Sequence, residues 1–138
     1  MPVNINNDAR QHLRSDRQNL RVKTQIPCQV GPPGGETSVA LILDLSCGGV
    51  KFSCNQQVVN KLFPEDAAPL GVVLDVFINI QFNLSEDDAP DALIKTGARV
   101  VHTERLAQDL FQVGVHFIDL TQADTEKLQI FIGECRQG

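Results

Sequence analysis

The sequence predicts a mainly β protein: a six-stranded antiparallel β-barrel with a C-terminal amphipathic α-helix and a flexible basic N-terminal arm. The first observation behind this is that short segments of alternating apolar and polar residues recur along the chain, separated by turn-forming residues. The second is that one segment near the C-terminus changes to helical spacing. The third is the length of 138 residues, which suits one domain with a single core.

Six segments show the period of two that is typical of a half-buried strand. In the first of them, Val22, Ile26 and Val30 alternate with polar residues. In the fourth, Phe77 is an exception, because it falls on the polar side. Closing such a sheet into a barrel removes its exposed edges, so we expect a barrel whose strands follow one another as a meander. The expected strands span residues 22–30, 39–45, 50–54, 74–82, 93–104 and 110–117.

The connections and the helix follow from turn and capping residues. Residues 31–36, GPPGGE, predict a turn, residues 55–70 a loop with about one helical turn, and residues 85–91 an acidic loop. Residues 105–109 form the polar connection between the last two strands. Thr121, followed three residues later by Asp124, resembles a capping box at a helix start. The apolar stripe expected to pack on the sheet consists of Leu128, Phe131, Ile132 and Cys135.

The distribution of charge favours a small anionic ligand over a nucleic acid. Residues 1–25 carry five basic and two acidic side chains, a balance of 5 − 2 = +3. Residues 26–138 hold seven basic and fifteen acidic side chains, a balance of 7 − 15 = −8. Because binding DNA or RNA normally needs an extended basic face, we expect neither as a partner.

Composition also excludes a membrane protein and a metal site. No apolar run reaches the roughly 18 residues of a spanning helix, and the polar start lacks a signal peptide core, so we expect a cytoplasmic protein without membrane contact. The scattered cysteines and histidines form no spaced ligand set, so we expect no metal and no cofactor. We expect reduced thiols, with a Cys47–Cys54 disulfide as the less favoured alternative.

Two short motifs carry the functional prediction. Arg17 and Arg21 form an RxxxR pattern just before the first strand, and residues 44–49, DLSCGG, form DxSxxG at the turn after the second. With both motifs in this order, the chain resembles the PilZ family, and in particular the C-terminal domain of flagellar brake proteins. The resemblance implies a PilZ-type barrel over residues 17–138, after an arm of residues 1–16, and a receptor for cyclic di-GMP. It also implies a downstream protein partner, in the control of bacterial motility or biofilm.

The chemistry of these residue types fits that ligand. A guanidinium can donate two hydrogen bonds to guanine O6 and N7, pair with a phosphate or stack on a base. The Asp44 carboxylate can accept from the guanine N1 and N2 hydrogens, and Ser46 adds a short donor or acceptor. Gly49 permits a positive φ and close approach of a ligand to the backbone. The candidate ligand-binding residues are therefore Arg17, Arg21, Asp44, Ser46, Gly48 and Gly49, with Arg14 as an auxiliary contact.

Several alternatives accompany this prediction. Arg10 and Arg14 form a second RxxxR pattern, but they lie further from the strand than Arg17 and Arg21. Asp44 and Ser46 could instead cap their own turn, and Gly48 and Gly49 could serve only a tight hairpin. Asp16, just before the motif, weakens the case for a stacked ligand pair because it repels an anion. A PilZ-like interaction module without nucleotide binding is the main functional alternative.

We do not expect an enzyme. Asp44, Ser46 and either His102 or His116 could nominally make a catalytic triad, but Ser46 lacks a GxSxG elbow.

Overall fold

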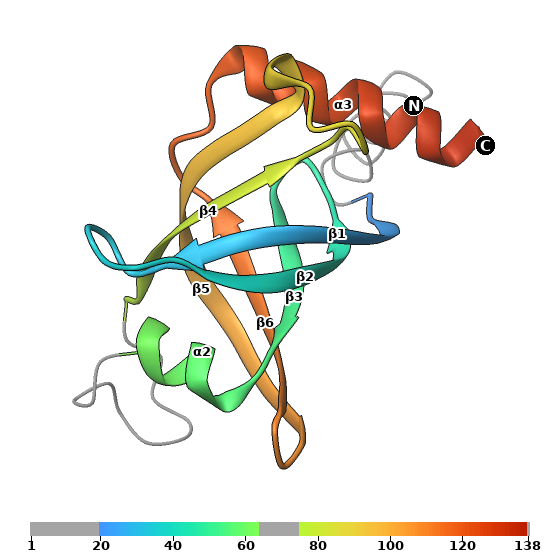
Figure 1. Cartoon of the computed structure of the whole chain (residues 1–138). Helices are drawn as coiled ribbons and strands as arrows, with labels where there is room; N and C mark the ends of the chain where they lie inside the picture. The colour runs from blue at the N-terminus through green and yellow to red at the C-terminus, as the bar shows by residue number, and fades with distance from the viewer. Residues whose placement is uncertain (1–19, 64–74, 138) are drawn as a thin grey trace, which may run out of the picture.

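Six antiparallel strands form a closed barrel in the computed structural model, which describes residues 20–63 and 75–137 (Figure 1). This confirms the predicted fold class. The predicted arm, residues 1–16, lies outside the described residues. The elements are β1 (Val22–Gly31), β2 (Ser38–Leu45), β3 (Gly49–Cys54), α2 (Gln56–Leu62), β4 (Phe77–Asn83), the 3-10 turn η1 (Pro90–Ala92), β5 (Leu93–Ala107), β6 (Leu110–Phe117) and α3 (Gln122–Gln137).

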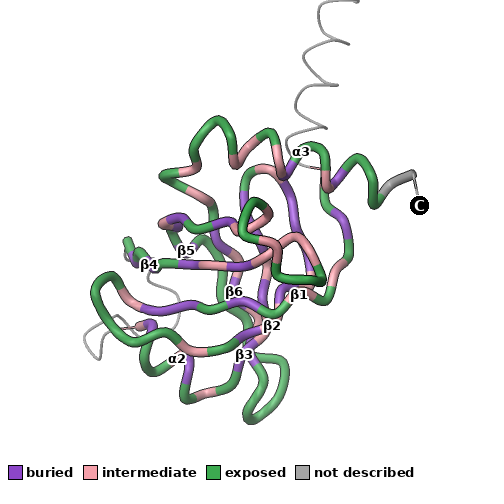
Figure 2. Tube along the Cα trace, turned by 45° about the horizontal axis from the view of Figure 1, so that its top comes forward, coloured by how far each residue is buried: buried purple, intermediate pink, exposed green. Residues whose placement is uncertain are grey.

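The barrel core is made by the apolar residues of each alternating strand. In β3, Val50, Phe52 and Cys54 are buried, whereas Lys51 and Ser53 between them are only half-buried. Figure 2 shows a similar alternation of buried and less buried positions along the other strands, as far as Val100 in β5. Phe77, the predicted exception in β4, is indeed exposed. Because successive side chains of a strand point to opposite faces, the polar partners lie on the outer surface of the barrel.

The order of the strands differs from the predicted meander. The barrel runs β1-β2-β3-β6-β5-β4, so β3 pairs with β6, and β4 closes the barrel against β1. Short connections join β1 to β2, β2 to β3, β4 to β5 and β5 to β6, and each of these pairs is adjacent. Only the long connection between Cys54 and Phe77 lets the next strand lie elsewhere. The predicted meander was wrong because this long connection allows β4 to pair away from β3, the strand that precedes it in the sequence.

The predicted turn between β1 and β2 is confirmed. The amide of Gly35 donates to the carbonyl of Pro32 at 2.9 Å, and Gly34 has a φ of 76°. These features, with Pro33 at the second position of the turn, are those of a type II β-turn, whose third residue needs a positive φ. The sequence GPPGGE therefore suits this turn.

The segment after β3 is more helical than predicted. Instead of a loop with about one turn, α2 has seven residues, about two turns of helix. The side chain of Asn55 accepts a hydrogen bond from the amide of Val58 at 3.0 Å and so caps the helix. Val58 and Leu62, four residues apart, are buried in the core. This contact with the barrel stabilises a helix that is too short to be evident from its sequence.

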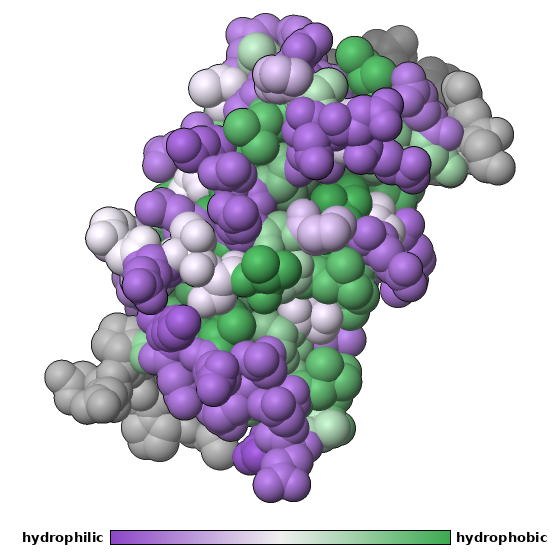
Figure 3. Space-filling model, viewed as in Figure 1, coloured by the Kyte–Doolittle hydropathy of each residue, from purple (hydrophilic) through white to green (hydrophobic). Residues whose placement is uncertain are grey.

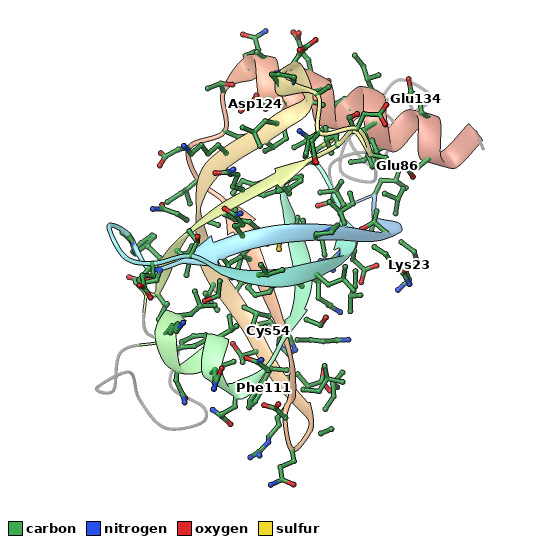
Figure 4. The ribbon with its side chains drawn as sticks, viewed as in Figure 1. Lys23, Cys54, Glu86, Phe111, Asp124 and Glu134 are labelled. Atoms are coloured by element: carbon green, nitrogen blue, oxygen red, sulfur yellow. The ribbon has the colours of Figure 1, made fainter. Side chains whose placement is uncertain are left out.

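The hairpin of β5 and β6 is longer than predicted. Strand β5 continues to Ala107, so only Gln108 and Asp109 remain of the predicted polar connection. Residues 101–107 are all exposed, and the hairpin projects beyond the barrel at the bottom of Figure 1. The guanidinium of Arg105 lies 5.5 Å from the ring centre of Phe111, which is labelled in Figure 4, and donates to the carbonyl of Gln108 at 2.8 Å. These contacts stabilise strand pairing in a stretch of high polarity.

Helix α3 packs on the barrel largely as predicted. The amide of Asp124 donates to the hydroxyl of Thr121 at 3.1 Å, which confirms the N-terminal cap. Leu128 and Ile132 belong to the core, and Phe131 packs partly against it. Cys135 is exposed, so its place in the buried stripe was wrong. The end of α3 runs past the strands, where no sheet covers it (Figure 1).

The surface is mixed in character. Hydrophilic residues cover the top and the bottom of the face shown in Figure 3, with hydrophobic residues between them. Among the described residues, no helix is both long and apolar enough to cross a membrane.

Candidate functional site

The DxSxxG motif forms the tight connection between β2 and β3. The Ser46 hydroxyl oxygen accepts from the amides of Gly48 at 3.2 Å and Gly49 at 3.1 Å, and the hydroxyl lies 3.2 Å from the Gly49 carbonyl, to which it donates. The Ser46 amide also donates to that carbonyl at 2.9 Å. Ser46 therefore caps its own turn, which is the structural alternative that we stated for it. This side chain holds the shape of the loop and is itself buried.

Gly49 is required by strand packing. A Cβ atom at this position would lie 2.0 Å from the carbonyl oxygen of Val115 in β6. The φ of Gly49 is outside the positive range, so this turn does not use the positive φ that a glycine permits. The close neighbour that demands a glycine is the backbone of β6, which pairs with β3 at this point.

Asp44 lies between two lysines on the outer face of the barrel. Its register partners are Lys23 on β1 and Lys51 on β3. Lys23 Nζ is 3.1 Å from Asp44 Oδ1, and Figure 4 shows Lys23 beside the start of β1. The lysine side chain is 90% exposed and the aspartate only 10%, so the pair contributes little to stability but neutralises the carboxylate. The local turn cap proposed as an alternative for Asp44 is replaced by this cross-strand pair.

The outer face continues across β6 and β5 with further polar residues. Lys51 is paired in register with Gly114, and Gly114 with His102. Two residues further along each of these strands, Gly49 is paired with His116. Directly paired residues of antiparallel strands project from the same face of the sheet. The register shift between Val100 and His102 in β5 is a β-bulge, which brings His102 into this row.

These rows border one cavity of about 520 Å³. This volume is within the range of about 300–1,000 Å³ that is usual for small-molecule sites. Five predicted site residues line it: Arg21, Asp44, Ser46, Gly48 and Gly49. The predicted Arg17 and Arg14 lie outside the described residues. The structure thus brings together every predicted site residue that it describes.

Sequence reasoning missed part of the cavity wall. Lys51, His102 and His116 line it from β3, β5 and β6, and Thr125 and Gln129 line it from α3. The two histidines were considered only as isolated residues or as triad members. The alternation within β3 and β6 predicts that the side chains of Lys51 and His116 point outward. That these two residues lie close together depends on the pairing of β3 with β6, which the alternation does not predict. Thr125 and Gln129 carried no signal in the sequence.

The electrostatics of the cavity favour an anion. Of the charged residues that line it, Arg21 and Lys51 are cationic and only Asp44 is anionic, and Lys23 offsets the charge of Asp44. The cavity is therefore a cationic area on a body whose net charge from residue 26 onward is −8. Arg21 is exposed and directly precedes β1, while Leu20 beside it packs partly against the core. That packing fixes the backbone from which the guanidinium extends.

The surroundings of Ser46 differ from those of a catalytic serine. All hydrogen bonds found for the Ser46 hydroxyl in the described part of the chain stay within its own turn, and none reaches a histidine. Nor do the described residues contain a group of three or more His, Cys, Asp or Glu side chains that could hold a metal ion.

The cysteines are all free. Burial raises the pKa of Cys28 to about 12 and that of Cys54 to about 11, and it also raises the pKa of Cys47, in the DxSxxG turn. A raised pKa keeps a thiol protonated and unreactive at neutral pH. The packing that we expected is found for Cys28, Cys47 and Cys54, whereas Cys135 is exposed.

Comparison with known proteins decides the family, because the sequence model of the PilZ domain matches residues 8–134. The chain belongs to the PilZ family. The match confirms the resemblance inferred from the two motifs, and it spans both RxxxR patterns and the DxSxxG turn. A search of curated protein sequences gives no match.

Solved structures show the same PilZ barrel. The chain is similar to the PilZ domain with c-di-GMP of YcgR from Escherichia coli, with 14% identity, a TM-score of 0.57, and coverage of 86% of this chain and 89% of that one. It is also similar to the Bacillus subtilis inhibitor of motility MotI/DgrA, with 15% identity, a TM-score of 0.57, and coverage of 85% and 48%. A third similar structure is K. pneumonia MrkH in its apo state, with 17% identity, a TM-score of 0.57, and coverage of 86% of this chain and 50% of that one. This PilZ chain thus spans about half the length of the last two proteins.

Proposed function

We propose that this PilZ domain is a receptor for cyclic di-GMP. The ligand binds in the cavity beside the DxSxxG turn, and the domain passes the signal to a protein partner. The observation that carries the proposal is the convergence of Arg21, Asp44 and the turn on one cationic cavity. Family membership and the c-di-GMP complex of the YcgR domain support the same ligand. Neither catalysis, nor a cofactor, nor a nucleic-acid or membrane partner is part of the proposal.

Each group has a role that its surroundings allow. The exposed guanidinium of Arg21 donates to guanine O6 and N7 or to a phosphate. Asp44 accepts from guanine N1 and N2 through the oxygen that Lys23 does not hold. Ser46, Gly48 and Gly49 act through the shape of the turn, since the serine hydroxyl is already engaged there.

Arg17 supplies the second guanidinium of the RxxxR motif in this proposal, and Arg14 an auxiliary phosphate contact. The register with Arg17 and Arg21 is supported by the position of Arg21, which directly precedes β1 and lines the cavity.

An isothermal titration tests the ligand. We expect the protein to bind cyclic di-GMP and to bind GMP and linear dinucleotides at least tenfold more weakly, because only the cyclic ligand presents two guanines and two phosphates in one compact shape. Comparable affinity for GMP would contradict the proposal. No binding of cyclic di-GMP would favour the alternative, a PilZ module that acts only through protein contacts.

A hydrogen-exchange measurement tests how the signal leaves the site. We propose that residues 1–20 become ordered over the bound ligand, because Arg17 gains its phosphate or guanine contacts only then. We expect cyclic di-GMP to slow amide exchange in residues 1–20 while leaving the amide of Glu36 unchanged, because Glu36 is exposed in the turn between β1 and β2 and lies outside the cavity. Equal exchange with and without bound ligand would show that the arm is not the switch.

A further inference from the structure

Gly114 lines the cavity without a side chain. This glycine lies on the outer face of β6, where the neighbouring outward positions carry Gln112 and His116. A Cβ atom at position 114 would lie 3.5 Å from the Cβ of His102 and 3.9 Å from Val101 Cγ2, which are ordinary van der Waals distances. Unlike at Gly49, the strand pairing here does not forbid a side chain. The missing side chain leaves a hollow in the cavity.

Cationic or hydrogen-bonding groups flank this hollow on both sides. The register places Lys51 on one neighbouring strand and His102 on the other. With strands spaced about 4.8 Å apart, the two flanking backbones are roughly 10 Å apart, a gap that their side chains can span toward one bound group. His116 is the next outward residue along β6 and lines the same cavity. Among the described residues no ion pair is found for Lys51, whereas Glu104 lies 3.8 Å from His102.

We propose that one phosphate of the cyclic dinucleotide occupies the hollow over Gly114, held between Lys51 and His102. This inference rests on the proposed function and adds a subsite to it, on the β6 wall next to the DxSxxG turn, because Gly49 of that turn pairs with His116, two residues beyond Gly114. The Lys51 ammonium donates to phosphate oxygens as a point charge, and an imidazole N–H of His102 donates from the other side. Both groups that the register places directly beside the hollow, Lys51 and His102, can donate hydrogen bonds, and the acceptor Asp44 lies one strand further away, beyond Lys51. A phosphate offers acceptor oxygens to both sides at once, so this arrangement favours a phosphate over a base. With the phosphate anchored here, a guanine can extend across the cavity toward Arg21 and Asp44.

Gly114→Val provides the steric test. Valine favours strands and glycine weakens them, so we expect an unchanged or higher melting temperature together with at least tenfold weaker binding of cyclic di-GMP. Gln112→Val is the matched control, because residue 112 precedes Gly114 on the same face of β6 but does not line the cavity. It should bind as the unchanged protein does. Unchanged binding by Gly114→Val, or equal losses in both variants, would overturn the subsite.

Lys51→Gln tests that the bound group is a phosphate. We expect roughly fivefold weaker binding and a weaker dependence of affinity on salt, since one exposed ionic contact is lost. Lys95→Gln removes the same charge from an exposed position of β5 outside the cavity and should change neither quantity. Unchanged salt dependence in Lys51→Gln would overturn the phosphate assignment even if Gly114→Val blocks binding. Absence of cyclic di-GMP binding by the unchanged protein would refute both this subsite and the proposed function.

Discussion

Replacing Gly49 with alanine is expected to destabilise the barrel by about 1–3 kcal/mol, the usual cost of inserting atoms into a well-packed site. The reason is that the new Cβ would lie 2.0 Å from the Val115 carbonyl oxygen. The obstacle is backbone, so β3 and β6 must move apart, which strains the register from Gly49 to Cys54. Urea unfolding followed by circular dichroism measures the loss. Binding of cyclic di-GMP should fall as well, because the DxSxxG turn moves with β3.

Gly114→Ala is the matched control for this experiment. It adds the same methyl group to the partner strand, but at 3.5 Å from its nearest neighbour, so we expect stability to change by no more than about 0.5 kcal/mol. A barrel that tolerates alanine equally at both positions would contradict the close packing of β3 against β6. Gly49 would then be free to serve the ligand, as the sequence motif alone suggested.

Arg21→Ala is expected to have the largest effect on binding. Loss of a bidentate or charge-assisted contact costs about 1–3 kcal/mol, a weakening of roughly 5- to 150-fold. Stability should change by less than about 0.5 kcal/mol, because the side chain is exposed and precedes the first strand. Calorimetric titration with cyclic di-GMP measures the first quantity and urea unfolding the second. Arg21→Lys should recover only part of the affinity, since lysine keeps the charge without the planar fork.

Lys95→Ala controls for the loss of one positive charge, because Lys95 is exposed on β5 and lies outside the cavity. It should leave binding unchanged. Arg17→Ala should resemble Arg21→Ala, while Arg10→Ala should have little effect. If Arg10→Ala were the damaging change and Arg21→Ala were silent, the first RxxxR pattern would be the ligand-binding one.

Much of the candidate site could be predicted because its motifs are local. The DxSxxG motif is a single turn whose shape depends on its own hydrogen bonds, such as those of Ser46. Arg21 is adjacent in sequence to β1, so its position follows from where the strand begins. The residues missed by sequence reasoning, Lys51, His102 and His116, belong to strands that meet only in the folded barrel.

The sequence by itself determined the strands, the C-terminal helix and the two motifs, because each depends on spacing within a few residues. The period of two in β3 already distinguished the buried Phe52 from the outward Lys51. Only the tertiary structure decided that β3 pairs with β6 and that β4 closes against β1, because the long connection after Cys54 leaves that choice to barrel closure. The same closure placed Gly114 between Lys51 and His102 and set the backbone of Val115 against Gly49. Register between strands far apart in sequence depends on packing the whole core, which no local pattern encodes.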